Sequence, residues 1–311
     1  MTITKHTTSL LLLLGALSAA SPALAQADPQ EAGSAIVVTG QVPLSEDRAL
    51  DVVRRVAQPV DGQLARFHDR VCPLVTGFDA PYAAMVAEWI RATAERVGAR
   101  VDGEGCAPNL FVVIVDDGPG FVRELARRDG GALASLPDDE FEELTSAQGT
   151  ARSWSMTLLT NSMGAVAGRP SPSRGGGAVK TGFAGSSVSF GDVGVMRVYE
   201  SSTINPSVQQ TIHSAWVVLE TEATLGKSLR QIADYAAMRG LAMVRPDELD
   251  GSEDTILDLF EPGSPAAPPE LTGFDLAYLS SLYRVPSLRP ASSQLHYIAE
   301  SIVREAREEA P

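Results

Sequence analysis

The sequence LGKSLRQIADYAAMRGLAMV, residues 225–244, contains the best-defined helix of the chain, and the rest of the predicted fold is arranged around it. Ser228 and Gln231 have the spacing of a capping box, in which the two side chains satisfy two unpaired backbone N–H groups. Apolar residues recur at three- and four-residue spacing, at Leu229, Ile232, Ala233, Ala236 and Ala237. Gly240 is expected to end the helix in the left-handed conformation. One face of this helix is therefore predicted to be buried.

Apolar, β-branched runs predict strands ahead of this helix. Residues 211–220 precede it directly, and residues 110–115, LFVVIV, are typical of a central strand buried on both faces. Further strands are expected at 71–75, 154–160 and 193–200, the last pairing with 211–220.

Helical patterns flank and follow these strands. They cover residues 80–97 (after Asp79, ended by Gly98), 121–128, 138–144, 254–260, 272–283 and 293–308. Thr272 and Asp275 form a second capping-box pattern. Strands grouped ahead of helices predict an α+β fold, as a single domain at residues 60–308 with a central mixed sheet, packed helices and a helical C-terminal part.

The first 25 residues have the pattern of a secretory signal peptide. Lys5 and His6 form the basic region, residues 10–17 form an apolar region too short to span a bilayer, and cleavage is expected between Ala25 and Gln26. This predicts a periplasmic or secreted protein with no membrane-spanning segment after cleavage. Residues 26–59 are expected to be a flexible N-terminal arm, residues 164–194 a flexible insert rich in Gly, Ser and Pro, and residues 261–270 a Pro-rich linker.

The charge balance excludes some classes of partner. The formal net charge is −14, and loss of Lys5 with the signal peptide makes it one unit more negative. Binding of nucleic acid or anionic lipid needs clustered basic charge, so neither is expected as a partner.

The chain has two cysteines, Cys72 and Cys106. An even pair in an oxidising compartment favours a disulfide, and closing a loop of about 34 residues stabilises by roughly 3 to 4 kcal/mol. The alternative, free thiols or a redox pair, lacks the Cys-x-x-Cys spacing of such sites. A metal site would need further ligands, and the mature chain retains His68, His213 and His296, far apart in sequence.

Acidic residues after the strands are the main candidates for chemistry. Asp116 and Asp117 follow residues 110–115 and begin the sequence Asp-Asp-Gly-Pro-Gly. A carboxylate pair there can bind a cation or act as a base, and the same sequence is also typical of a turn. No G-x-S-x-G, P-loop, dinucleotide fingerprint or zinc spacing is present, so no catalytic set, metal or cofactor is predicted.

Three blocks resemble known exported proteins. LRQIADYAAMRGLA (229–242), LTGFDLAYLSSLYRV (271–285) and VCPLV…CAPNLFVVIV (71–115) are similar to uncharacterised exported alphaproteobacterial proteins. IVVTGQ (36–41) resembles a segment of TonB-dependent receptors, but the alternating strands of a large barrel do not follow it, which favours a tethering arm or an edge strand.

The order of these helices also resembles exported families with a zincin-like, metallopeptidase-derived fold. A zincin helix carries H-E-x-x-H, two metal-binding histidines with a general base between them. The matching window here is Arg230-Gln231-Ile232-Ala233-Asp234. Arg230 cannot bind a metal and Gln231 cannot act as a base, so the resemblance implies an inactive peptidase. Arg230 and Asp234 are then expected to form an exposed i,i+4 pair worth a few tenths of a kcal/mol.

These observations favour a non-enzymatic periplasmic or envelope-associated protein, including a zincin-like pseudoenzyme, that binds a protein or peptide partner. The alternative is a metal-dependent hydrolase whose carboxylates converge in the fold; the candidates are Asp116, Asp117, Glu220, Glu222 and Asp234. A third hypothesis, a carrier of a small ligand, requires an enclosed apolar pocket.

Overall fold

The computed structural model describes most of the chain from residue 45 onward. The described residues are 45–128, 132–133, 136–161, 166, 179–180, 187–188, 206–246, 248–249, 254–261 and 267–309. The expected signal peptide, its cleavage site and the expected strand at 193–200 lie outside them. The described part of the 164–194 insert includes β4 (Val179–Lys180) and β5 (Ser187–Val188), which pair antiparallel.

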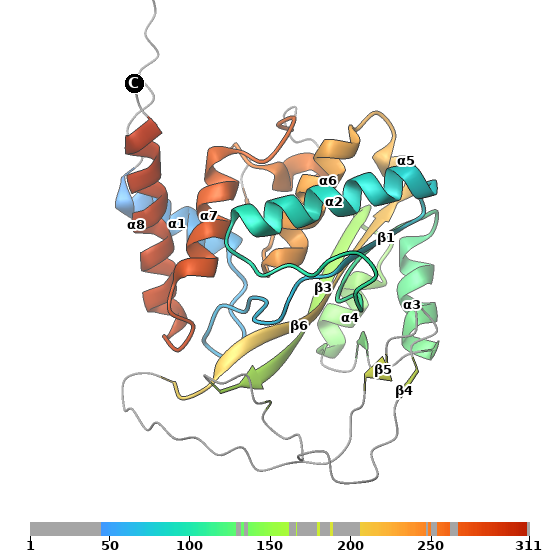
Figure 1. The fold of residues 1–311 in the computed structure, drawn as a ribbon, viewed down its shortest axis with the longest axis horizontal. Coiled ribbons are helices and arrows are strands. Elements are labelled where there is room, and N and C mark those ends of the chain that lie inside the picture. The colour runs from blue at the N-terminus through green and yellow to red at the C-terminus, as the bar shows by residue number, and fades with distance from the viewer. Residues whose placement is uncertain are drawn as a thin grey trace, which may run out of the picture. The chain divides into compact units, whose positions relative to one another are not determined.

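A mixed four-stranded sheet forms the centre of the described chain (Figure 1). The order is β1 (Pro73–Thr76), β2 (Leu110–Val115), β6 (Gln209–Glu220), β3 (Ala151–Thr160). β1, β2 and β6 are parallel, and β3 is antiparallel to β6. The predicted α+β class is confirmed, and the expected central strand at 110–115 is β2.

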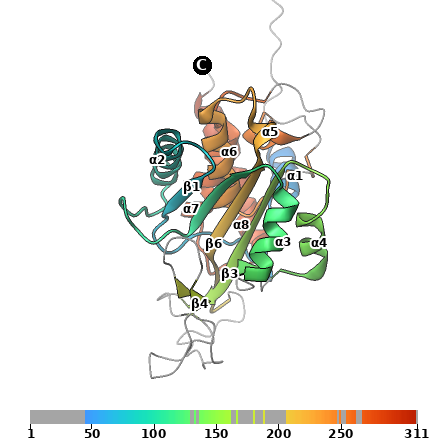
Figure 2. The ribbon, with the colours of Figure 1, turned by 90° about the vertical axis from the view of Figure 1, so that its right-hand side faces the viewer.

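Helices cover both faces of the sheet (Figure 2). One face packs in the larger core against α1 (Glu46–Val56), α2 (Ala80–Arg96), α6 (Leu229–Leu241), the 3₁₀ helix η2 (Ile256–Phe260), α7 (Gly273–Arg284) and α8 (Ala291–Glu309). The strands alternate, so Val112 and Val217 face this core while Phe111 and Trp216 face the other.

The second face packs against α3 (Gly118–Arg128) and α4 (Asp138–Leu144). Three aromatic rings from neighbouring strands dominate it. Trp216 stacks on Phe111 with ring centroids 4.1 Å apart and on Trp154 at 5.6 Å. Such pairs contribute roughly 0.5 to 1.5 kcal/mol each beyond area burial, so these rings fix the relative positions of β2, β6 and β3.

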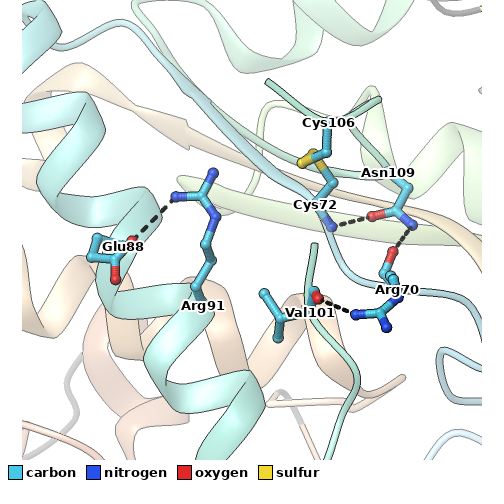
Figure 3. The surroundings of a disulfide bond; sticks show 7 residues. All are labelled: Arg70, Cys72, Glu88, Arg91, Val101, Cys106 and Asn109. Carbon is cyan, nitrogen blue, oxygen red and sulfur yellow. Dashed lines mark hydrogen bonds and ion pairs between the residues drawn. A yellow bond between two sulfur atoms is a disulfide. The ribbon is translucent and has the colours of Figure 1, made fainter. Parts of the chain in front are cut away.

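The predicted disulfide joins Cys72 and Cys106, whose Cα atoms are 6.1 Å apart (Figure 3). The bond closes a unit of strand, helix and strand, β1–α2–β2. Asn109 supports it, because its Oδ1 accepts from the Cys72 N–H at 2.7 Å and its Nδ2 donates to the Arg70 carbonyl at 2.9 Å. The cysteine pair is therefore a structural crosslink.

Both predicted capping boxes are present. Ser228 and Gln231 exchange hydrogen bonds of 3.1 and 3.0 Å at the start of α6, and Thr272 and Asp275 do the same for α7. Gly98, at φ +92°, follows α2 as predicted.

Two sequence predictions about helices were wrong, one about a segment expected to be flexible and one about the end of α6. Residues 46–56, expected in a flexible arm, form α1, capped by Ser45 and buried through Ala49, Val52, Val53 and Val56, a helical stripe that packs in the larger core. Gly240 does not end α6, because the helix continues to Leu241 and is capped by Ala242. A Cβ at position 240 would be 2.9 Å from Leu110 Cδ1. The small residue lets α6 approach β2 closely.

Candidate functional site

The carboxyl ends of β1, β2 and β6 meet at one edge of the sheet, which we call the carboxyl edge. β2 and β6 end in register, with Val115 opposite Glu220, and α2, α3 and α5 (Thr221–Thr224) follow the three strands directly. Ligands of α/β sheets bind at such an edge where neighbouring connections leave to opposite faces. Here β1 leads to α2 on one face and β2 leads to α3 on the other.

The turn after β1 passes close to β2 beside this switch point. Gly77 follows β1 with φ +97°, and a Cβ on it would lie 2.2 Å from the carbonyl oxygen of Ile114 in β2. Only glycine fits a backbone approach this close. The turn that follows β1 thus lies directly against the backbone of β2.

Asp116 and Asp117 lie at the carboxyl edge, and both are exposed. Asp117 Oδ1 accepts from the Gly120 N–H at 2.8 Å, and its carbonyl accepts from the Phe121 N–H at 3.0 Å. These are the bonds of a helix N-cap. Of the two interpretations of this sequence, the structure supports a turn that starts α3.

Glu220, another acidic candidate, also lies at this edge and forms an ion pair with Arg152. Its Oε1 accepts from Arg152 Nη1 at 2.8 Å; the Arg152 side chain is 4% exposed and that of Glu220 24%. Arg152 also donates to the carbonyls of Leu144, Ser146 and Gln148. Glu222, by contrast, is exposed on α5.

Arg152 was missed by the sequence analysis. It stands in β3 as the only charged residue of ARSWSMTLLT, and a buried arginine requires a carboxylate partner. A charge in an otherwise neutral strand was the available signal, but the sequence did not show which acid would pair with it. Gly118 opens α3 beside the pair, since a Cβ there would be 2.7 Å from Arg152 Nη1.

The three candidates on α6 form a separate polar cluster. Asp234 Oδ2 accepts from Arg230 Nε at 2.8 Å and from the Leu271 N–H at 3.0 Å. Gln231 Nε2 donates to the Pro268 carbonyl at 2.9 Å. These contacts tie the start of α6 to the segment that leads into α7, and no contact of the described residues joins them to Asp116, Asp117 or Glu220.

The pair of Arg230 and Asp234 was predicted to be exposed, and this prediction was wrong for Asp234. Its side chain is 0% exposed, and burial raises the pKa of its carboxyl while the Leu271 N–H and Arg230 lower it. Arg230 is partly exposed and lies over the Trp89 ring at 5.9 Å. The difference arises because segment 268–271 covers Asp234, which helical spacing cannot show.

His68, His213 and His296 lie on separate elements. His68 precedes β1, His213 is the extra residue at a bulge of β6, and His296 is on α8. Burial, with the charges of Arg66 and Arg100, lowers the pKa of His68 to about 4. Among the described residues, no three His, Cys, Asp or Glu side chains are grouped so that they could hold a metal ion.

Comparison with known proteins returns no matching family model, no matching curated sequence and no matching solved structure. Within the described residues, no helix has both the length and the apolar character needed to cross a membrane.

Proposed function

We propose that the protein is an exported, non-catalytic binding protein of the periplasm or cell envelope, with a protein or peptide partner. The observation that carries the proposal is the state of the acidic side chains at the carboxyl edge. Asp117 caps α3, and Glu220 neutralises the buried Arg152. A general acid or base must have its polar atoms free to exchange a proton with a substrate, and here Asp117 Oδ1 and Glu220 Oε1 are engaged by the chain itself.

The Cys72–Cys106 bond supports the exported part of the proposal. Structural disulfides persist in oxidising compartments and are rare in the cytosol. The bond is compatible with either the periplasm or the cell exterior.

The contacts of α6 support the pseudoenzyme that the zincin-like resemblance implies. Where a zincin carries its metal ligands and general base, Arg230 and Asp234 bind each other and Gln231 caps the helix. These side chains stabilise the fold. A structural role at such positions is expected in a protein that has lost catalysis and keeps the fold for binding.

An activity screen of the mature protein tests the non-catalytic part. Peptide, ester and phosphoester substrates are offered with Zn²⁺, Mn²⁺ or Mg²⁺, and we expect no turnover above a heat-inactivated sample. Turnover that is lost in Asp117→Asn or Glu220→Gln, and kept in the exposed control Glu46→Gln, would establish the metal-dependent hydrolase instead. Circular dichroism confirms that each variant is folded.

Two measurements in cells test export and binding. Mass spectrometry of the periplasmic fraction should find an N-terminus at Gln26; a full-length form confined to the cytoplasm would contradict export. Crosslinking in intact cells should yield the same crosslinked partner from independent cultures. Crosslinks that vary with culture, or that form equally with an unrelated periplasmic protein, would contradict a specific partner.

A further inference from the structure

An open groove of about 520 Å³ lies between the start of α8 and the segment that joins α7 to α8. This segment is at the lower left of Figure 1. The groove is distant in sequence from the carboxyl edge and uses none of the candidates discussed above except His296. Its lining residues are Val285, Pro286, Arg289, Ser292, Ser293, His296, Tyr297 and Glu300. Its volume is within the range of small-molecule sites.

The segment beside the groove is held by hydrogen bonds from residues 62–66. Arg66 Nη1 donates to the Val285 carbonyl at 2.8 Å, and Gln63 Nε2 donates to the Ser287 carbonyl at 3.1 Å. The Ala291 N–H donates to the Gly62 carbonyl at 2.7 Å. Two prolines, Pro286 and Pro290, restrict the same segment further. The groove is therefore formed before a ligand arrives, which lowers the entropic cost of binding.

The two ends of the groove carry opposite charge. At one end Arg289 lies beside Ser292 and Ser293 in the first turn of α8, where the helix dipole adds positive potential. At the other end is Glu300, two turns further along the helix. Among the described residues, no hydrogen bond or ion pair engages the side chain of Arg289 or of Glu300, and both residues are exposed. Both charges are available to a ligand.

The lining between the two ends is less polar. Along α8, His296 and Tyr297 lie between the serines of the first turn and Glu300, and Tyr297 supplies a partly exposed ring. Pro286 adds exposed apolar surface to the groove, while Val285 is almost fully buried. His296 Nδ1 lies 2.7 Å from the Ser292 carbonyl, which can only accept, so Nδ1 carries a hydrogen and Nε2 is the ring's other polar atom. An apolar centre between a cationic and an anionic end suits a zwitterion with a small apolar middle.

We propose that this groove binds short zwitterionic peptides, with the C-terminal carboxylate at Arg289 and the N-terminal ammonium at Glu300. The distance along α8 from Ser293 to Glu300 is about 10 Å at 1.5 Å per residue. An extended tripeptide spans about 10 Å at 3.3 to 3.6 Å per residue. The inference deepens the proposed function, on which it rests, by naming the chemistry of the peptide.

Titration of the mature protein with tri-L-alanine, followed by NMR of the backbone amides, tests the inference. We expect shifts confined to residues 285–300, with a Kd of roughly 0.1 to 10 mM for so small a ligand. Arg289→Gln and Glu300→Gln should each weaken binding about tenfold, since each removes a charge-assisted contact. Arg307→Gln and Glu308→Gln make the same charge changes at the exposed far end of α8 and should leave binding unchanged.

Blocked peptides test the orientation. The peptide with a C-terminal amide should bind the unmodified protein weakly, and Arg289→Gln should not weaken its binding further. The N-acetylated peptide should also bind weakly, and Glu300→Gln should not weaken its binding further. Binding of acetate as tight as that of tri-L-alanine would reduce the site to an anion site and overturn the inference. Absence of shifts at about 10 mM peptide, or equal weakening in the control variants, would also overturn it.

The two proposals fail in different experiments. Turnover in the activity screen would remove the non-catalytic function and leave peptide binding in this groove measurable. If tri-L-alanine did not bind in the groove, the proposed function would still be supported by the crosslinked partner and by the absence of turnover.

Discussion

The hydroxyl of Thr255 donates a hydrogen bond of 2.5 Å to the carboxylate of Asp275, twenty residues further along the chain. Both side chains are buried, at 1% and 0% exposure. Asp275 also accepts from the Ile256 N–H and from the N–H and hydroxyl of Thr272. One carboxylate thus joins the start of η2 to the start of α7. Burial raises the pKa of Asp275, and these donors oppose that rise.

Replacement of this carboxylate should be costly. Asp275→Ala leaves two backbone N–H groups and two hydroxyls without their acceptor, and we expect a loss of about 2 to 4 kcal/mol in the free energy of unfolding. Asp254→Ala, at an exposed position just before Thr255, should stay within about 0.5 kcal/mol. Urea unfolding measures both, and equal losses would contradict the role given to Asp275.

His68 should make the protein less stable in acid. Its pKa is about 4 in the folded protein, below the ordinary 6.5, so between these pH values the unfolded chain binds more protons. The free energy of unfolding should therefore fall on acidification through this window, by on the order of 1 to 3 kcal/mol from this group.

The raised pKa values of Asp234 and Asp275 act in the opposite direction, because there the folded state binds protons more readily. Comparison with His68→Gln isolates the histidine. The difference between the two unfolding free energies should change from pH 7 to about pH 4, and parallel profiles would show that His68 has no such effect.

Removal of the disulfide should destabilise the protein without changing its fold. Cys72→Ser with Cys106→Ser releases a loop of 34 residues, and we expect a loss of about 3 to 4 kcal/mol on the chain-entropy account. Urea unfolding of the oxidised protein, the reduced protein and the double variant measures this. The last two should agree, and a double variant as stable as the oxidised protein would contradict the prediction.

Alanine at position 240 should reverse the usual effect of glycine replacement in a helix. In an open helix interior Gly→Ala stabilises by roughly 1 kcal/mol. Here the new Cβ would lie 2.9 Å from Leu110 Cδ1, so we expect Gly240→Ala to destabilise by about 1 to 3 kcal/mol. Gly103→Ala, where nothing lies within 4 Å, is the control and should be close to neutral. Thermal unfolding distinguishes the two, and stabilisation by Gly240→Ala would show that α6 can move away.

Local sequence signals predicted much of the fold. The capping boxes of α6 and α7 depend on residues three apart, and β2 is a continuous apolar run bounded by turn residues, so each is decided within a few positions. The Cys72–Cys106 bond was predicted from the count of cysteines and the expected oxidising compartment alone. α1 could have been found as well, since its apolar stripe is regular, but the acidic, Ala-rich composition of residues 26–59 favoured an arm.

The features that sequence reasoning missed depend on contacts between distant segments. Arg152 pairs with Glu220 across 68 positions, and segment 268–271 covers Asp234 although it lies 37 residues away. Gly240 could be read as a helix end because the approach of Leu110 is not encoded near it. The groove at α8 likewise depends on residues 62–66, which hold the segment before α8 in place by hydrogen bonds, so periodicity along α8 gave no sign of it.

Under the proposed export, the Cys72–Cys106 bond also determines when the chain reaches its full stability. While its thiols are reduced, the protein lacks the crosslink around β1 and α2, and its unfolded form is more populated. An exported chain meets the oxidant only after it has crossed the inner membrane. Full stability would then be reached at the destination, and a precursor retained in a reducing compartment would stay easier to unfold, thread and degrade.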